Sequence, residues 1–302
     1  MLIVSFPTEA AYSGHNCSTL AGNSTSTFKS NLNQLLSTLS SNSNRNDTAG
    51  FYNATVGTAY GLFLCRRDVS ARICEECVAN ATSEALLRCP DNQQAVVWYD
   101  HCMLRYSNQP FYSEAATSPS MTAWSPRNLT QYVAEPAELN DVLVTTLENL
   151  VPKAAKATDK FATEKATFTA DLILYTVYSL GQCTQDLSAA DCIACLREGA
   201  TQLVMSKQGG RVLYPSCNVR FEMYPFYQEV GGSTMGSMGS DDPTADLEFS
   251  GRDWFWPLAA MEVTPWRRRR SFGGGSRSTK KEREEKELKK REGKKEEGKR
   301  IK

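Results

Sequence analysis

The sequence predicts an α+β protein built from two tandem copies of one disulfide-stapled domain, each with two helices packed on an antiparallel sheet. The first observation is an internal repeat: a Cys-x8-Cys-x2-Cys pattern that begins at Cys65 returns at Cys183, 118 positions later. The second is length, because 302 residues suit two domains of about 100 to 150 residues each. The third is a shared order of helical and extended patterns within the two copies.

Each copy opens with an amphipathic helix. Apolar residues recur there at i, i+4, i+8 and i+11, which places them on one helical face. They are Phe28, Leu32, Leu36 and Leu39 in the first copy and Leu139, Leu143, Leu147 and Leu150 in the second, 111 positions later.

A second helix is expected to begin at Ser70 and at Ser188, whose hydroxyls can cap it, and to run through the Cys-x2-Cys pair toward Leu87 and Val204. The remaining β-rich runs are 52–56, 95–106 and 211–223. The simplest interpretation is a domain of about 105 residues in which two helices pack on an antiparallel sheet.

Ten cysteines, an even number, predict a set of disulfides. The second copy lacks partners for Cys17 and Cys89, whose places fall near Asn128 and residues 205–208, so these two are expected to bond to each other. Two cysteines one helical turn apart should each bond outward. The expected bridges are Cys17–Cys89, Cys65–Cys74, Cys77–Cys102, Cys183–Cys192 and Cys195–Cys217, which leaves the second copy less stable.

Disulfides and glycan acceptor motifs both predict an extracellular protein. The N-terminal run 1–6 is apolar but shorter than a complete signal peptide, and no run of about 18 apolar residues predicts a membrane span. Candidate N-glycosylation sites begin at Asn16, Asn23, Asn46, Asn53, Asn80 and Asn128.

The zero net charge hides two parts of opposite sign. Residues 267–302 carry 17 Lys and Arg against 7 Asp and Glu, so the preceding residues carry 17 against 27. An acidic body argues against nucleic-acid binding, which needs a basic surface. From residue 231 onward the composition is low in complexity and predicts a disordered basic tail.

The pattern around the cysteines resembles a known plant family. It rests on the cysteine spacing, on the segment 99–107 (Tyr-Asp-x-Cys-x-Leu-Arg-Tyr-Ser) and on the segment 209–227 (Gly-Gly-Arg-Val-x4-Ser-Cys-Asn-x-Arg-x-Glu-x-Tyr-Pro-Phe-Tyr). These are similar to the ginkbilobin-homologous, or stress-antifungal, domains of cysteine-rich repeat secretory proteins and receptor-like kinase ectodomains. The resemblance implies a five-stranded sheet in each domain, the bridges above, an apoplastic location, and defence roles without enzyme activity.

The expected boundaries are domain 1 at 10–115, a linker at 116–127, domain 2 at 128–230 and the tail at 231–302. The family's antifungal founder binds mannose through an Asn, an Arg and a Glu. Domain 1 has Ser18, Val96 and Ser107 at these places, so its pocket is lost. Domain 2 offers Asn128, Arg211 and Glu222.

An Arg fork and a carboxylate suit sugar hydroxyls, although a surface ion pair is the plain alternative. On one unbroken strand Arg211 and Glu222 would point to opposite faces, so a bend at Pro215 is required for them to converge.

Other chemistries find less support. Zinc would need mostly cysteine ligands in a reducing compartment, since His15 and His101 are the only histidines. A thiol redox sensor uses the same Cys-x2-Cys spacing and stays an alternative. Nucleophile-elbow, zinc-protease and kinase motifs are absent. We therefore expect no cofactor, no metal and no catalysis.

The predicted function is a secreted plant recognition protein that binds a mannose-type glycan, cell-wall carbohydrate or a protein in defence. The alternatives are an interaction module that pairs with other cysteine-rich ectodomains, including a truncated receptor-kinase ectodomain, and the thiol sensor.

Overall fold

The computed structural model describes residues 10–18, 25–44, 50–128, 136–170, 172–203 and 207–228. All of them belong to one compact unit, Met1–Trp266. The N-terminal run, the acceptor motifs at Asn23 and Asn46, and the tail lie outside the described residues, as do the side chains of 136–139.

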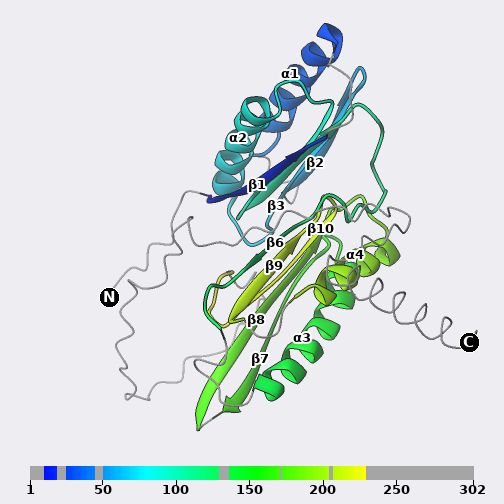
Figure 1. The fold of residues 1–302 in the computed structure, drawn as a ribbon. Helices are drawn as coiled ribbons and strands as arrows, with labels where there is room; N and C mark the ends of the chain where they lie inside the picture. The colour runs from blue at the N-terminus through cyan, green and yellow to red at the C-terminus, as the bar shows by residue number, and fades with distance from the viewer. Residues whose placement is uncertain are drawn as a thin grey trace, which may run out of the picture. The chain divides into compact units, whose positions relative to one another are not determined.

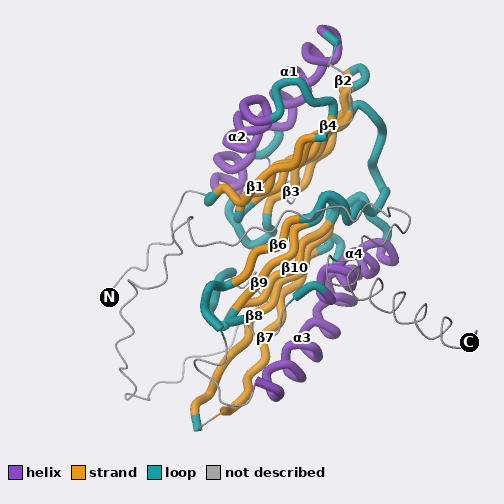
Figure 2. The backbone as a smooth tube through the Cα atoms, viewed as in Figure 1, coloured by secondary structure: helices purple, strands orange, loops and turns teal. Residues whose placement is uncertain are grey.

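The first repeat is a five-stranded antiparallel sheet with two helices on one face (Figures 1 and 2). The strand order is β1-β4-β5-β3-β2. In chain order the elements are β1 (Tyr12–Cys17), α1 (Ser26–Ser41), β2 (Phe51–Val56), β3 (Ala59–Cys65), α2 (Ala71–Arg88), β4 (Gln94–Tyr99) and β5 (Cys102–Ser107).

The second repeat has the same architecture, with strand order β6-β9-β10-β8-β7. Its helices likewise cover one face of its sheet (Figure 2). The elements are β6 (Met121–Trp124), α3 (Pro136–Lys156), β7 (Phe161–Ala170), β8 (Ile173–Cys183), α4 (Ala189–Thr201), β9 (Gly209–Leu213) and β10 (Cys217–Glu222). The predicted fold class is therefore confirmed.

Local capping determines where the helices begin. The Ser70 hydroxyl accepts a hydrogen bond from the Ile73 amide at the start of α2, and Ser188 accepts one from the Asp191 amide at the start of α4. Each bond satisfies a helix N–H that has no partner within the helix. Both caps are the serines that the sequence predicts.

Each repeat buries its own core between helices and sheet. In the first, the face of α1 predicted from periodicity is buried together with Leu35. In the second, Leu143, Leu147 and Leu150 of α3 are buried in the corresponding place.

The five disulfides link the pairs expected from the sequence: Cys17–Cys89, Cys65–Cys74, Cys77–Cys102, Cys183–Cys192 and Cys195–Cys217. Four of them join the two cysteines on α2 or α4 to cysteines on interior strands of the sheet that the helix covers. No cysteine is free.

Two details differ from the sequence analysis. The segment 116–127 is not only a linker, because it contains β6, which pairs with β9 and completes the second sheet. Pro215 does not bend one strand. It lies in the hairpin between β9 and β10, so the chain reverses between Arg211 and Glu222.

Candidate functional site: the interface between the repeats

The helix-free faces of the two sheets contribute to one shared apolar cluster. The first repeat supplies five buried side chains from its sheet, and the second supplies Met121 and Leu213. The five from the first sheet are Leu62, Leu64, Val96, Trp98 and Met103, and Phe111 beyond that sheet also belongs to the cluster.

A close contact at Gly14 and two hydrogen bonds add to this cluster. A Cβ atom on Gly14 would lie 2.6 Å from the sulfur of Met121, so a larger residue there would require the Met121 side chain to shift. The Trp98 indole N–H donates to the Tyr214 carbonyl at 3.3 Å, and Gln182 donates through Nε2 to the Cys65 carbonyl at 3.0 Å. Both bonds join the repeats.

Two aspartates, Asp68 and Asp186, each accept a hydrogen bond from the other repeat. The Ser113 amide, just beyond the first sheet, donates to Asp186 Oδ2 at 2.6 Å. The Gln228 amide, just beyond the second sheet, donates to Asp68 Oδ2 at 3.0 Å. The donors differ by 115 positions and the acceptors by 118, the displacements of the sequence repeat. Each repeat therefore holds the segment that leaves the other.

The two segments that leave the sheets also make equivalent contacts, each with an arginine of its own repeat. The Arg105 guanidinium lies 4.0 Å from the centre of the Phe111 ring, and Arg220 lies 4.3 Å from that of Phe226. Such cation–π contacts are stabilising, more so when shielded from water.

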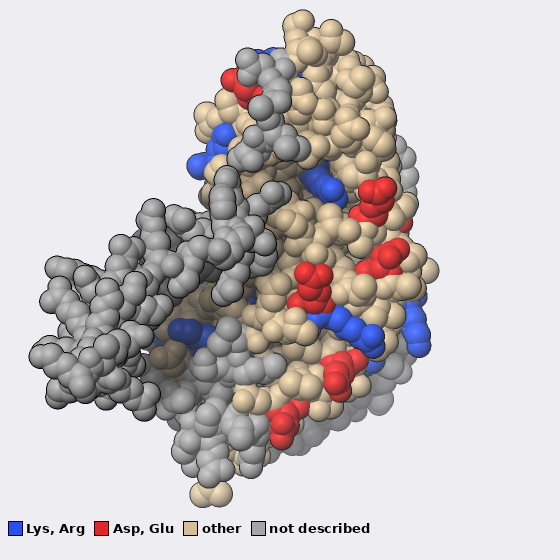
Figure 3. Space-filling model, turned by 45° about the vertical axis from the view of Figure 1, so that its right-hand side comes forward, with Lys and Arg blue, Asp and Glu red and all other residues tan. Residues whose placement is uncertain are grey.

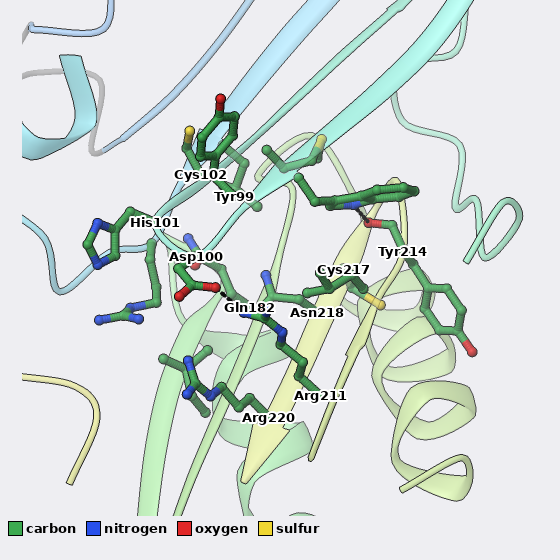
Figure 4. Close-up of a pocket in the computed structure, with 16 residues that line it drawn as sticks. Tyr99, Asp100, His101, Cys102, Gln182, Arg211, Tyr214, Cys217, Asn218 and Arg220 are labelled. Carbon is green, nitrogen blue, oxygen red and sulfur yellow. Dashed lines mark hydrogen bonds and ion pairs between the residues drawn. The ribbon is translucent and has the colours of Figure 1, made fainter. Parts of the chain in front are cut away.

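An asymmetric ion network adds to these equivalent contacts. Asp100, from the turn between β4 and β5, pairs with Arg211 of β9 (Figure 4). Within the second repeat, Arg220 pairs with Glu222 at 2.9 Å. The Arg211 side chain is 8% exposed and that of Glu222 is 4% exposed. The first repeat thus supplies one charge to a network otherwise built on the second.

The network sets unusual ionisation behaviour. Burial opposes the charge of Asp100, yet Arg211 and Arg220 hold the pKa of that carboxyl well below its usual range. Burial raises the pKa of Glu222 although Arg220 and Arg211 pull it down. Burial also lowers the pKa of His101, and the nearby Arg66 adds to this.

A cavity of about 40 Å³ lies beside the network, lined from both repeats by Asp100, His101, Gln182, Arg211 and Arg220 among others (Figure 4). This is room for a few water molecules and far below the roughly 300 Å³ at which small-molecule pockets begin. The cavity is therefore a feature of the packing rather than a sugar-sized pocket.

The predicted sugar residues divide between two places. Arg211 lies opposite Arg220 in the ladder and Glu222 opposite Gly209, which places Arg211 and Glu222 on the same face. The hairpin, rather than a bend, brings them together. A side chain on Gly209 would collide with the Glu222 carboxylate. Asn128 is apart, exposed at a bridge to Lys207.

The sequence reasoning did not find Asp100, Asp68 or Asp186 as interface residues. A signal existed for the last two, since they match each other between the repeats and lie outside the apolar pattern. The sequence carries no such signal for Asp100, because its counterpart in the second repeat is Pro215.

The structure also resembles solved proteins. The crystal structure of the tandem DUF26 ectodomain of the Arabidopsis thaliana cysteine-rich receptor-like protein PDLP8 matches with a TM-score of 0.57 and 21% identity, covering 71% of this chain and 99% of that one. The corresponding ectodomain of PDLP5 matches with a TM-score of 0.55 and 22% identity, covering 70% and 98%. At these identities the likeness shows the fold alone.

Curated relatives are more similar in sequence. Cysteine-rich receptor-like protein kinase 25 of Arabidopsis thaliana is 40% identical over 256 residues, which are 81% of this chain and 37% of the kinase. Cysteine-rich receptor-like protein kinase 19 of the same plant is 39% identical over 228 residues, 74% of this chain and 35% of the kinase. The chain spans little more than a third of the length of these relatives.

The repeats themselves match one family model, described as salt stress response/antifungal, at residues 16–109 and again at 126–224. The two matches cover all four helices and every strand of the two sheets except β6 and most of β1. The chain belongs to the salt stress response/antifungal family and carries two copies of its domain in tandem.

Proposed function

We propose that this chain is an extracellular, non-enzymatic recognition module of plant defence or stress responses that binds a protein partner, with its two repeats acting as one rigid body. The observation that supports this proposal most directly is that Arg211 and Glu222 are both already engaged in ion pairs. A sugar would need both side chains. Arg211 is held by Asp100 of the first repeat, in an ion pair that fastens the repeats together. Glu222 is buried in an ion pair with Arg220 of the same strand.

Charge and surroundings support the same function. The described part of the face drawn in Figure 3 mixes acidic and basic side chains and shows no continuous basic patch of the kind that nucleic acid requires. Among the described residues no helix is long and apolar enough to cross a bilayer. Five disulfides favour an oxidising compartment outside the cell.

The relatives favour recognition over catalysis. The curated relatives are receptor-like kinases by name, and the solved relatives are ectodomains of receptor-like proteins. Ectodomains of receptors bind ligands or one another, and the apolar cluster and hydrogen bonds that join the repeats give such a partner a fixed surface.

Mannose-type binding by Asn128, Arg211 and Glu222 is the second candidate. The observation in its favour is that Arg211 and Glu222 share one sheet face. For this site to work, a sugar would have to displace Asp100 from Arg211 and gain entry to a cavity of about 40 Å³.

A paired binding screen separates the two candidates. The full secreted chain is applied to a glycan array and to immobilised cysteine-rich plant ectodomains. The protein-recognition proposal expects saturable binding to an ectodomain and none to glycans. A mannose-type signal that Arg211→Ala abolishes and Arg105→Ala retains would replace it with the sugar candidate, and no saturable binding to any ectodomain would contradict it.

A further inference from the structure

The edge strand β7 is the longest exposed edge of either sheet. It pairs with β8 without a break from Phe161 opposite Gln182 to Ala170 opposite Ile173, with no bulge and no proline. On its other side no described strand pairs with it, since β7 ends the strand order of its sheet. Regular edges of this kind template the addition of another strand unless they are blunted.

The second repeat has lengthened this edge. In the first repeat the equivalent hairpin closes after Val56 opposite Ala59, which corresponds to Ala166 opposite Val177. Residues 167–176 continue the ladder by four further residue pairs and a turn. Figure 1 shows the β7–β8 hairpin reaching past the other strands of its sheet.

Backbone geometry defines which groups face outward. The Lys160 carbonyl accepts from the Cys183 amide at 3.0 Å, so residues of even number in β7 bond to β8. The residues of odd number, including Thr163, Thr167 and Thr169, therefore direct N–H and C=O groups away from the sheet. Thr167 and Thr169 are exposed.

Glycan acceptor motifs lie in or near the strands at the other three sheet edges, but none lies in β7. Asn16 lies within β1, Asn53 within β2, and Asn128 four residues beyond β6. No acceptor motif occurs after Asn128 in the whole sequence. Glycans at these positions would obstruct strand addition at three of the four sheet edges and leave β7 open.

We propose that β7 is a dimerisation edge, at which two copies of this chain pair their β7 strands antiparallel around a two-fold axis at Ala166. This goes beyond the proposed function, because it assigns a separate surface and requires no ligand. The two helical layers then lie on the same side of a continuous ten-stranded sheet.

Side-chain charge selects the register. An axis at Lys165 would place two lysines directly opposite each other, which is destabilising. An axis at Ala166 instead places Lys165 opposite Thr167 and Thr163 opposite Thr169, and it pairs the outward-facing residues with each other. It matches nine residues of each strand, from 162 to 170, without setting like charges opposite.

The hairpin tip also gains cover in this arrangement. Leu172 is 99% exposed at φ 65°, and Ile173 and Leu174 beside it are 53% and 68% exposed. In the Ala166 register the tip lies next to the start of the partner's β7, where Phe161 is half-buried. The Leu172 side chain then loses contact with water.

The first experiment measures the mass of the full secreted chain across a concentration series by light scattering. Thr167→Pro removes an outward N–H and leaves the bonds to β8 in place, whereas Thr167→Val keeps that N–H. The proposal expects wild type and Thr167→Val to dimerise alike, and Thr167→Pro to weaken dimerisation at least tenfold. At a concentration where both are monomeric, Thr167→Pro and wild type should have the same melting temperature. A wild type that stays monomeric, or a Thr167→Pro variant that dimerises like wild type, overturns it.

The second experiment tests the register by crosslinking on non-reducing gels. Ala166→Cys would set the introduced thiols opposite each other, with Cα atoms about 4.5 Å apart, within reach of a disulfide. Ala162→Cys changes a half-buried alanine on the same strand and face, but its thiols would lie about 25 Å apart. Covalent dimer is expected from Ala166→Cys alone. Equal crosslinking by both variants, or none by Ala166→Cys, overturns the register and with it the dimer.

Discussion

Asp68 and Asp186 occupy the same place in the two repeats, and each accepts a hydrogen bond from the backbone segment that leaves the other repeat. The two are not equally buried. The Asp68 side chain is 1% exposed and also holds Arg66 through two bonds of 2.6 and 2.9 Å, whereas Asp186 is half-buried. The reciprocal contacts should therefore contribute unequally to stability.

Asp68→Ala should lower the free energy of unfolding by about 3 kcal/mol, because it leaves the largely buried Arg66 without its carboxylate. Asp186→Ala should cost about 1 kcal/mol, the usual contribution of a hydrogen bond. Chemical denaturation of both variants measures the difference. Equal losses would show that the two contacts do not differ as their burial suggests.

Asp100 and Arg211 should be energetically coupled. A double-mutant cycle with Asp100→Asn and Arg211→Met should give a coupling of about 1 to 3 kcal/mol, since Arg211 is only 8% exposed and the pair joins two repeats. The exposed pair Arg72 and Glu76 on α2, measured the same way, is the control and should give at most about 0.5 kcal/mol. A coupling no larger than the control would contradict the ion pair's role in docking.

Glu222 should make stability depend on pH. Because burial raises its pKa in the folded state, the folded chain binds the proton more readily, so this residue adds stability as pH falls from 7 toward about 4.5. Its contribution is at most about 1.4 kcal/mol per pH unit. Over this pH range the charge of Asp100 does not change, since Arg211 and Arg220 hold its pKa well below the range.

Comparison with Glu222→Gln isolates that effect. His101 acts in the opposite direction, because burial lowers its pKa, but it does so in wild type and variant alike. Urea denaturation at pH 7, 6 and 5 should show the stability advantage of wild type over the variant growing as pH falls. A difference that is independent of pH would mean that Glu222 titrates normally.

The Cys17–Cys89 bridge should account for much of the stability of the first repeat. It joins residues 72 positions apart, so replacing both cysteines with serine should cost about 4 kcal/mol in the loop-entropy model. Proteolysis at rising temperature, read by the fragments released, should then show the first repeat cleaved as early as the second, which lacks this bridge. Unchanged cleavage of the first repeat would argue against the model.

Leu172→Gly should stabilise the free hairpin by about 0.5 kcal/mol. Leucine at φ 65° is strained, and a side chain that is 99% exposed gains little from packing. The melting temperature is measured at low protein concentration, with Leu174→Gly in the regular strand as a control that should be destabilising. A loss of stability in Leu172→Gly would show that the side chain has contacts within its own repeat.

Periodicity and cysteine spacing were enough to predict each repeat, because its helices and bridges are specified within about 100 residues. The rise in displacement from 111 to 118 between Leu150 and Cys183 already indicated extra residues there, which the structure places in the β7–β8 hairpin. The contacts between repeats were not predictable in this way. Asp100 and Arg211 are 111 positions apart and follow no local pattern, and their counterparts Pro215 and Val96 carry no charge.

The shared apolar cluster has a consequence for how the protein is made. Synthesis proceeds from the N-terminus, so the first repeat can form its disulfides before Met121 and Leu213 have been made. Until then its own cluster residues lack their contacts with the second repeat; they include Leu62, Leu64, Trp98 and Met103. Until β9 has been translated and docked, this face is exposed to water and to other chains. The first repeat thus keeps an apolar face uncovered for about a hundred further residues of synthesis, and it buries this face only when the second repeat docks.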